Sequence, residues 1–492
     1  MNGRGKSDDS VVPTKPPNKA ASAAAEEVEE RESTKGNASQ QNASRTQSRT
    51  NDAPSALDRV RKAAIGNKKQ KFTALFHHLT IERLRAAFFA LGRSASAGVD
   101  GVTWKQYREC LEDNLSELHR QLHQGAYRAK PSRRVFIPKA DGRERPLGIA
   151  SLQDKIVQRA VVEILNAIYE ADFLGFSYGF RPGRGQHDAL DALAVGLCYR
   201  KVSWVLDADI RGFFDAIDHG WLLRFVKHRI ADNRIIRLIQ KWLRAGVLHE
   251  GKTTVQEVGS PQGATVSPLL ANIFLHYVFD LWANQWRNRH ARGDVVIVRY
   301  ADDVVVGFQH LSDARRFRAA MSDRLNAFGL ELHPDKTRMV RFGRFASRDA
   351  RTAGERGPGT FEFLGFTHYG SNGKTGSFRV MRRTSKRRMR ATLKALKDKL
   401  MKNRHEPIPK QGAWLRRVLQ GYFQYHAVYG NGHLLDGFRG QVIGSWLHAL
   451  RRRSQRHRMT WKRMNTLVRR WIPSVRIVHP WPNERFFAKH PR

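Results

Sequence analysis

The four residues Tyr300–Asp303 place two adjacent carboxylates between two strongly apolar segments. Residues 295–299 and 304–308 are short and rich in β-branched side chains, which predicts two buried strands joined by an acidic turn. Such turns usually hold Asn-Gly or Gly-Gly, which carry no charge. Two neighbouring carboxylates repel each other unless a cation lies close by, and their hard oxygen atoms suit Mg²⁺. A solvated acidic turn is the alternative, but strands this apolar favour a turn held close to the core.

A second acidic segment, residues 202–209, alternates so that Asp207 and Asp209 share one face of a predicted strand. Two aromatic residues, Phe213 and Phe214, follow shortly after it. Phosphoryl transfer by two metal ions needs carboxylates from separate segments that hold the ions about 3.5–4 Å apart. One carboxylate on a strand and two in a facing hairpin satisfy this requirement, although spacing alone leaves other chemistries open.

The charge of the chain is strongly one-sided, with 87 Lys and Arg against 45 Asp and Glu, a net charge of +42 and a pI near 11.0. This excess predicts a polyanionic partner, and the interspersed aromatic residues favour nucleic acid over a membrane surface. A generally basic protein is the alternative. No apolar run reaches the roughly 18 residues that span a bilayer. The two cysteines, Cys110 and Cys198, fit a reducing compartment, so we expect a cytoplasmic, nucleoid-associated protein without a membrane partner.

These segments together resemble the group II intron-encoded reverse transcriptase/maturase family. The resemblance covers roughly residues 58–485 and rests on Tyr300–Asp303, on Asp209 with an aromatic residue five positions later, and on connecting motifs in the family's order. It implies an α+β fold with right-hand polymerase architecture: fingers, a palm with an antiparallel sheet and a catalytic hairpin, and then an α-helical thumb/maturase domain. The connecting motifs are residues 137–139, 145–149, 177–183, 259–263, 267–273 and 363–366.

Composition and resemblance divide the chain into five segments. The first has almost no large apolar residues, so its burial would not offset chain entropy. No HNH nuclease motif follows Pro480, and we expect a form without that domain, which leaves open how a DNA strand would be cut. The segments are a disordered tail (1–56), an N-terminal extension with the start of the fingers (57–130), reverse transcriptase fingers and palm (131–375), a helical thumb/maturase (X) domain (376–455) and a basic segment of DNA-binding type (456–492).

Local patterns predict several elements inside these segments. Residues 130–150 are expected to form a strand hairpin that turns at Asp141–Gly142. Ser267 is expected as the N-cap of a helix with Pro268 at its first position. The apolar stripe that follows is interpreted as core. Three thumb helices are expected over 385–401, 411–429 and 438–453.

The resemblance also implies roles at an active site. Asp209, Asp302 and Asp303 match the palm carboxylates, which would act with two Mg²⁺ ions, and the backbone carbonyl of Ile210 would be a further metal ligand. Asp303 has a partly structural role as its alternative. Residues matched to the nucleotide are Phe214 at its sugar, Gln262 and Gly263 along its pocket, Lys139 and Arg145 on the triphosphate, and Lys336 near the leaving group, where a surface lysine in a turn is the alternative.

The region beyond residue 379 combines cationic and aromatic residues, which favours contact with phosphates together with base stacking over a plain solvated surface. The residues predicted to bind RNA are Arg382, Arg383, Lys386, Arg387, Arg388, Arg390, Tyr422, Tyr425, Arg451, Arg452 and Arg453.

The sequence therefore predicts an RNA-directed DNA polymerase and maturase that binds group II intron RNA, promotes splicing and copies the intron into DNA during retrohoming. Its expected partners are the intron RNA, target DNA, dNTPs and an RNA template with a DNA primer. One alternative is a stand-alone reverse transcriptase in phage defence or spacer acquisition, which the basic, aromatic C-terminal region opposes. Another is a non-catalytic RNA-binding splicing cofactor, which the three intact aspartates oppose.

Overall fold

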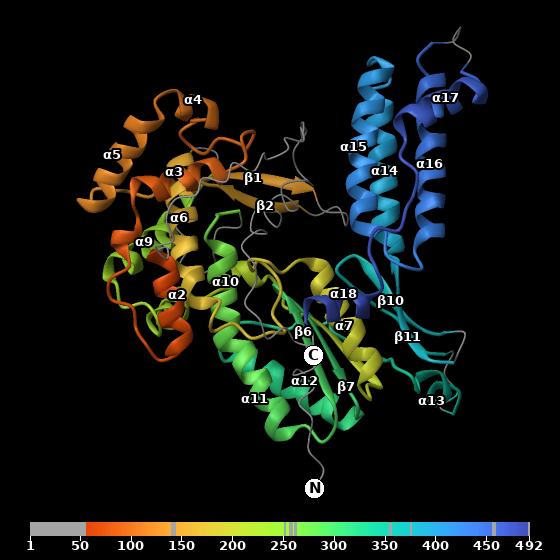
Figure 1. Ribbon diagram of the computed structural model, residues 1–492, viewed down its shortest axis with the longest axis horizontal. Helices are drawn as coiled ribbons and strands as arrows, with labels where there is room; N and C mark the ends of the chain where they lie inside the picture. Colours follow the sequence, from red (N-terminus) through yellow and green to blue (C-terminus); the bar gives the residue numbers. More distant parts are fainter. Residues whose placement is uncertain are drawn as a thin grey trace.

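The computed structural model shows an elongated molecule with helices at one end, a sheet at the centre and a helical bundle at the other end (Figure 1). Residues 1–56, predicted as a tail, lie outside the described residues except for Ala56, which begins helix α2 (Ala56–Gly66). No described helix is both long and apolar enough to cross a membrane. The described residues are 56–138, 144–249, 252–254, 259, 263–352, 354, 357–373, 376–454 and 459–490.

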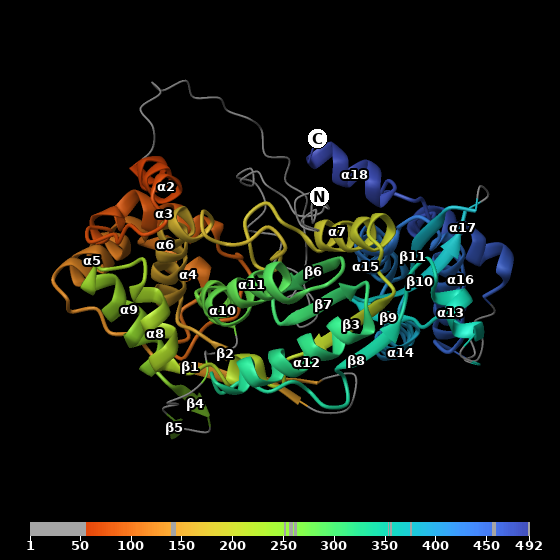
Figure 2. The same cartoon turned by 90° about the horizontal axis from the view of Figure 1, so that it is seen from below.

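The central sheet has four antiparallel strands, which in spatial order are β6 (Val295–Tyr300), β7 (Asp303–Phe308), β3 (Trp204–Asp209) and β8 (Arg338–Arg341) (Figure 2). Helices α12 (Leu311–Asn326) and α7 (Gln186–Tyr199) pack against it. Neighbouring residues of β6 enter different cores: Ile297 packs in the core that includes α12, and Val298 packs in the core that includes α7. Because both faces are covered, the strands are apolar on both sides, and the predicted hairpin is confirmed.

The helix predicted from Ser267 is present but differs in two respects. Helix α10 (Ser267–Leu275) has Val266 at its N-cap, so Ser267 and Pro268 both lie in the first turn, where proline needs no amide hydrogen. The helix then widens into a π-helical segment, η3 (His276–Asp280), before α11 (Leu281–His290). The stripe predicted as core is buried along α10, whereas Leu281 is exposed.

A second sheet, in the order β2-β1-β4-β5, lies at the same end of the molecule as helices α2 to α6. Strands β1 (Ser132–Pro138) and β2 (Glu144–Ile149) are antiparallel, which confirms the predicted hairpin, while its predicted turn at 141–142 lies outside the described residues. The other strands are β4 (Val247–His249) and β5 (Lys252–Thr254), and the surrounding helices are η1 (Phe76–His78), α3 (Ile81–Ala90), α4 (Trp104–Glu109), α5 (Leu111–His123), α6 (Leu152–Tyr169), α8 (His219–Lys227) and α9 (Asn233–Arg244).

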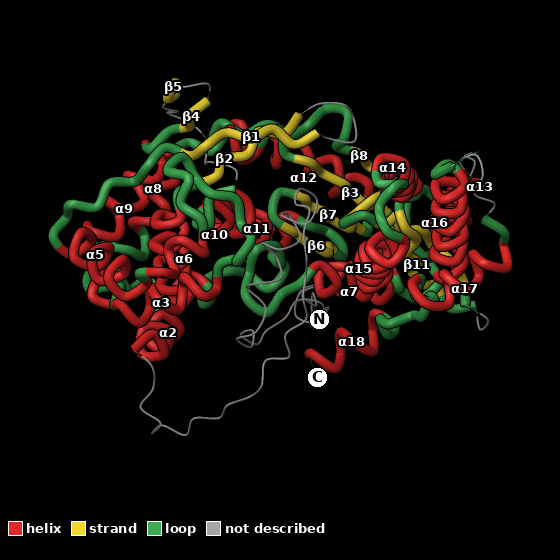
Figure 3. Tube along the Cα trace, turned by 90° about the horizontal axis from the view of Figure 1, so that it is seen from above, coloured by secondary structure: helices red, strands yellow, loops and turns green. Residues whose placement is uncertain are grey.

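At the other end, a small sheet leads into the helical bundle (Figure 3). Helix α16 (Gly432–Arg451) begins six residues before the predicted 438, because burial of Leu435 and Phe438 outweighs the low helix propensity of the neighbouring glycines. The sheet contains β9 (Phe361–Phe363), β10 (Phe366–Asn372) and β11 (Phe378–Thr384), α13 (Ala346–Thr352) precedes it, and the other bundle helices are α14 (Lys386–Lys402) and α15 (Ile408–His426).

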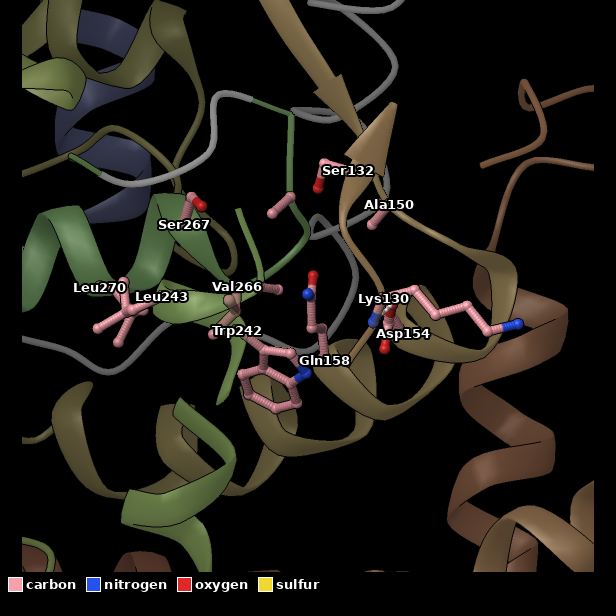
Figure 4. Close-up of a pocket in the computed structure, with 12 residues that line it drawn as sticks. Lys130, Ser132, Ala150, Asp154, Gln158, Trp242, Leu243, Val266, Ser267 and Leu270 are labelled. Atoms are coloured by element: carbon pink, nitrogen blue, oxygen red, sulfur yellow. Dashed lines mark hydrogen bonds between the residues drawn. The ribbon is translucent and has the colours of Figure 1, made fainter. Parts of the chain in front are cut away.

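A buried carboxylate, that of Asp154 on α6, joins strand β1 to the helices behind it. It accepts hydrogen bonds from Ser151 Oγ at 2.7 Å, from the Lys130 N–H at 3.1 Å and from the Tyr127 hydroxyl. Burial raises the pKa of Asp154. The adjoining cavity, which Gln158 also lines, has a volume of only about 10 Å³ (Figure 4). It is far too small for a nucleotide, so we assign this cluster a structural role.

The chain returns to the central sheet at its C-terminal end. Helix α17 (Trp461–Trp471) packs on α15, and helix α18 (Pro482–Lys489) then packs along α7 (Figure 2). The buried carboxylate of Asp191 on α7 pairs with Arg382 at 3.0 Å and also with Arg485 on α18. The segment predicted as a basic DNA-binding surface, 456–492, thus contains a helix whose cations neutralise acidic residues of α7.

Replacing Asp191 with Ala is expected to lower the free energy of unfolding by about 3–5 kcal/mol, because it leaves buried Arg382 unpaired and deprives Arg485 of its carboxylate partner. Thermal and denaturant unfolding would measure the loss, and limited proteolysis would show earlier cleavage near α18. Replacing Glu117, which makes an exposed pair with Arg120, is the control and should change neither readout. Equal stability of the two variants would contradict a clamping role for Asp191.

Candidate active site

Three carboxylates meet where strand β3 ends and the β6–β7 hairpin turns. Asp209, the last residue of β3, is paired directly with Asp303, the first residue of β7. Residues opposite each other on antiparallel strands share a face, with Cβ atoms about 4.5–5.5 Å apart. Asp302 precedes Asp303 in the two-residue turn. The sheet register therefore brings together the three acidic residues singled out in the sequence.

The electrostatics show an excess of negative charge at this point. Burial, followed by the charges of Asp302 and Asp209, raises the pKa of Asp303 to about 7, and the positive charge of Arg388 opposes that rise. Asp207, two residues before Asp209 on β3, pairs with Arg338 of β8 at 3.3 Å. The crowded carboxylates of the hairpin are thus only partly neutralised by the chain itself.

Lys336 supplies one of the neutralising charges, because its Nζ lies 2.8 Å from Asp209 Oδ2. The segment that carries it is tied to β3 by a hydrogen bond from the His333 N–H to the Asp209 carbonyl at 2.8 Å. Lys336 was predicted either beside a leaving group or as a surface lysine in a turn. The structure places it half exposed and in contact with Asp209.

Ile210, the further ligand suggested by the sequence, directly follows Asp209. It forms a bridge with Leu332 in which the flanking residues make the two hydrogen bonds, from Arg211 N–H to the Glu331 carbonyl and from His333 N–H to the Asp209 carbonyl. The bridge fixes the backbone on either side of Ile210, and the role of its carbonyl as a metal ligand stays a prediction.

This set of oxygen donors fits a hard divalent cation such as Mg²⁺. Burial raises the pKa of Asp303 most, and the neighbouring charges of Asp302 and Asp209 add to the rise, so a cation between these carboxylates would reduce their mutual repulsion. The side chains are not preformed as a closed metal site, since no group of three or more His, Cys, Asp or Glu residues in the described ranges has that spacing. The oxygen donors are of the kind that Mg²⁺ prefers, and the positive charge of Lys336 neutralises part of the negative charge of Asp209.

Phe214 lies in a short 3₁₀ turn, η2 (Phe213–Asp215), which follows strand β3. Its ring is half-buried and lies edge-on to Phe180 at 6.5 Å, whereas Phe213 is buried in the core. Gly263 approaches strand β2 so closely that a Cβ atom there would lie 2.9 Å from the Gly148 carbonyl. Lys139 and Gln262 lie outside the described residues, as does the side chain of Arg145.

Comparison with known proteins identifies the part of the chain that carries this site. Residues 137–368 match the family model described as reverse transcriptase (RNA-dependent DNA polymerase). This part of the chain is a reverse transcriptase domain. The right-hand polymerase fold inferred from the sequence is therefore confirmed, with the helical bundle following the domain.

Several curated proteins are similar to part of the chain. Protein YkfC of Escherichia coli K12 is 36% identical over 238 residues, which are 42% of this chain and 62% of YkfC. The group II intron-encoded protein LtrA of Lactococcus lactis subsp. cremoris is 35% identical over 222 residues, 45% of this chain and 37% of LtrA. An uncharacterized 91 kDa protein in a cob intron of Schizosaccharomyces pombe is 40% identical over 172 residues, 35% of this chain and 21% of that protein. The chain thus spans less than two thirds of each relative.

A fully buried arginine, Arg299 of β6, holds the β6–β7 hairpin of the reverse transcriptase domain in place. It contacts Asp280 twice, Nε to Oδ1 at 2.7 Å and Nη2 to Oδ2 at 2.6 Å. Nη2 also donates to Ser177 Oγ at 2.7 Å, and Nη1 donates to Asn272 Oδ1 at 3.0 Å and to the Ala301 carbonyl at 2.9 Å. The sequence analysis did not identify this cluster, although a charged residue at the end of an apolar strand is a signal for it.

The turn of the hairpin has a strained backbone. Ala301 has φ = 55°, a left-handed conformation that non-glycine residues adopt at a cost of about 1–2 kcal/mol. Gly179 packs against it so closely that a Cβ atom there would lie 2.3 Å from the Ala301 nitrogen. Asn272 fixes Gly179 in turn through a 2.7 Å hydrogen bond to its carbonyl. The orientation of Asp302 is therefore set by residues from three other segments.

The residues predicted to bind RNA differ in how far they are exposed. Lys386, Arg387, Arg388 and Arg390 are exposed on α14, as the prediction requires, and Arg388 also lies within electrostatic range of Asp303. Arg382 corrects the prediction, because it is buried and paired with Asp191. Of the others, Arg451 and Arg452 are exposed, Arg383 and Arg453 are half-buried, Tyr422 stacks on Phe438, and Tyr425 donates to the Leu364 carbonyl at 2.7 Å.

Replacing Arg299 with Met, or Asp280 with Leu, is expected to lower the free energy of unfolding by about 3–5 kcal/mol, because each change leaves the other charge buried and unpaired. The double variant should recover part of that loss, since it removes both charges. Chemical denaturation of the four proteins measures this coupling. Additive losses in the double variant would show that the two side chains do not act as a pair.

Proposed function

We propose that this protein is an RNA-directed DNA polymerase joined to an RNA-binding maturase, and that it binds a group II intron RNA, promotes its splicing and copies it into DNA during retrohoming. The observation that carries the proposal is the register of Asp209 against Asp303, with Asp302 in the adjoining turn, inside a domain of the reverse transcriptase family. Similarity to a group II intron-encoded protein supports the intron as the RNA partner.

The proposed reaction joins the 3′ oxygen of a DNA primer to the α-phosphorus of a dNTP and releases pyrophosphate. Asp209, Asp302, Asp303 and the Ile210 carbonyl would hold two Mg²⁺ ions, which supply charge stabilisation for the attacking and leaving oxygens when bound. Lys336, whose Nζ contacts Asp209, is proposed to act near the leaving pyrophosphate. Lys139 and Arg145 are proposed to contact the triphosphate, and Gln262 the nucleotide.

The selection of dNTPs is assigned to Phe214. Its half-buried ring is braced by Phe180 and Phe213, so it has little freedom to yield to an additional hydroxyl group. Gly263 is proposed to help shape the nucleotide pocket because it has no side chain. Its backbone lies so close to Gly148 that a side chain there would not fit. A rigid ring near the sugar would exclude ribonucleotides by overlap.

The nucleic acid is proposed to contact the thumb through the exposed face of α14. Lys386, Arg387 and Arg390 are solvent-exposed on its first turns, and the whole chain carries a net charge of +42. We propose the fingers and palm over 131–375 and the thumb/maturase domain over 376–455, with target DNA as a further partner of the basic C-terminal residues. Binding of this kind would place the protein in the cytoplasm at the nucleoid.

Replacing Asp302 with Ala is expected to abolish primer extension on an RNA template while RNA affinity changes less than twofold, because the phosphate contacts lie elsewhere. Extension of a labelled primer and filter binding would measure the two properties. Asp113→Ala, at an exposed aspartate on α5, is the matched control. Extension by Asp302→Ala at the wild-type rate would overturn the assignment, and a wild type that binds RNA without extending would favour the non-catalytic cofactor.

Replacing Phe214 with Val should admit ribonucleotides, because the shorter side chain removes the overlap with a 2′-hydroxyl group. The ratio of rNTP to dNTP incorporation is expected to rise at least tenfold, roughly the effect of 1.4 kcal/mol in discrimination. Phe317→Leu serves as the control, since Phe317 is a buried core ring that packs against Trp282 and Trp286. An unchanged ratio for Phe214→Val would assign the selection to another side chain.

A further inference from the structure

A pocket separate from the three carboxylates lies between helix α12 and the segment that joins α12 to strand β8. Its volume is about 450 Å³, within the range of roughly 300–1,000 Å³ that is usual for small-ligand sites. Its lining includes Arg315, Arg318 and Ser322 on α12 and Leu332, His333 and Thr337 on the following segment. The pocket has room for a nucleoside as well as a phosphate group.

The lining of this pocket is positively charged. Arg315 and Arg318 are exposed, and neither makes an ion pair or a hydrogen bond within the part of the chain that the structure describes. Arg316, between them, is engaged by Asp313 at 2.6 Å. The lining residues include no Asp or Glu. Two guanidinium groups one helical turn apart, without a carboxylate between them, favour a phosphate, whose oxygens match the planar donors of arginine.

Two polar atoms in the wall of the pocket also lack partners. Thr337 is 5% exposed, and its Oγ1 makes no hydrogen bond within the described residues. The same is true of Nδ1 of His333. Buried polar atoms are normally paired, and an unpaired hydroxyl destabilises the free protein. The Thr337 hydroxyl is therefore a donor that the fold leaves unused beside the two arginines, and His333 Nδ1 is a second polar atom without a partner there.

We propose that this pocket binds a phosphodiester of a nucleic-acid strand, with Arg315 and Arg318 on the phosphate oxygens and the Thr337 hydroxyl as a further donor. The proposal rests on the proposed function, because the RNA and DNA handled by the polymerase supply the strand. Leu332 provides an apolar surface for the adjoining sugar or base. The same segment carries Lys336, which contacts Asp209, so a bound strand would hold the segment that positions this lysine.

The test compares two double variants. The first carries Arg315→Ala and Arg318→Ala. The control carries Arg289→Ala and Arg351→Ala, and it removes the same charge from two exposed arginines elsewhere. The probes are a single-stranded RNA oligonucleotide and a DNA oligonucleotide of the same sequence, each titrated at several salt concentrations. Loss of two phosphate contacts should lower the log–log salt slope by about 1.4 and weaken binding roughly 25-fold near 0.1 M salt. A slope equal to that of the control pair would overturn the proposal.

A second variant, Thr337→Val, keeps the charge and the shape of the side chain. It is expected to weaken binding several-fold without lowering the melting temperature, because the hydroxyl has no partner in the free protein. A lower melting temperature with unchanged affinity would overturn the role of Thr337 as a donor.

The two oligonucleotides distinguish the sources of the strand. An equal loss on RNA and DNA supports recognition of the shared phosphodiester, and a loss on one alone supports that strand as the ligand. Arginine-dependent stabilisation by inorganic pyrophosphate, with no effect on either oligonucleotide, would overturn the proposal in favour of a free anion. Primer extension by the wild type tests the proposed function independently, so the two failures remain distinguishable.

Discussion

The β6–β7 hairpin depends on one buried ion pair, that of Arg299 with Asp280. Five hydrogen bonds from one guanidinium group join β6, the π-helical segment η3, helix α10, the loop at Ser177 and the turn of the hairpin. Two buried charges are costly to desolvate, and only excellent geometry and complete hydrogen bonding compensate for that cost. The π-helical segment ends at Asp280, where the carboxylate meets the guanidinium group in a two-bonded pair. These contacts make the turn rigid, because a shift of the Ala301 carbonyl would break its hydrogen bond with Arg299 in surroundings of low dielectric constant.

Backbone strain is concentrated around the same hairpin. Three non-glycine residues among those described have positive φ, namely Phe180, Ala301 and Leu364. Phe180 supports Phe214, Ala301 precedes the carboxylates, and the carbonyl of Leu364 receives the hydroxyl of Tyr425 from the thumb. Such conformations persist where the surroundings over-determine them, and they occur often at functional sites. Here the surroundings are Arg299, Gly179 and the thumb, so strain in the palm is balanced by contacts from segments far away in sequence.

The palm could be predicted from the sequence because its signals are local. The β-branched runs around residues 301–302 specify two strands, and the alternation in 202–209 places Asp209 on a definite face, so the meeting of the carboxylates follows from pairing alone. The burial of Arg382 could not be predicted in this way. A run of arginines has the same appearance whether it faces solvent or not, and Arg382 is buried only because Asp191, far away in the chain, meets it. The register of α18 against α7 and the unpaired arginines of α12 likewise depend on tertiary contacts that no local pattern encodes.

The burial of several arginines changes the meaning of the net charge. Arg181, Arg229, Arg299 and Arg382 all pair with buried or nearly buried carboxylates, so they add nothing to the surface that nucleic acid meets. Each of these pairs is neutral, so the excess positive charge lies on other residues, among them those at the N-terminus of α14. A helix N-terminus carries a partial positive charge and normally attracts acidic residues, yet the first turn of α14 contains Lys386, Arg387 and Arg388 and no acidic side chain. This arrangement is unfavourable for an isolated helix. It becomes favourable when a polyanion is bound there, and Arg388 lies within electrostatic range of Asp303. A phosphate backbone bound at α14 would relieve the repulsion among these cations, whereas the crowded carboxylates of the palm require cations beside them.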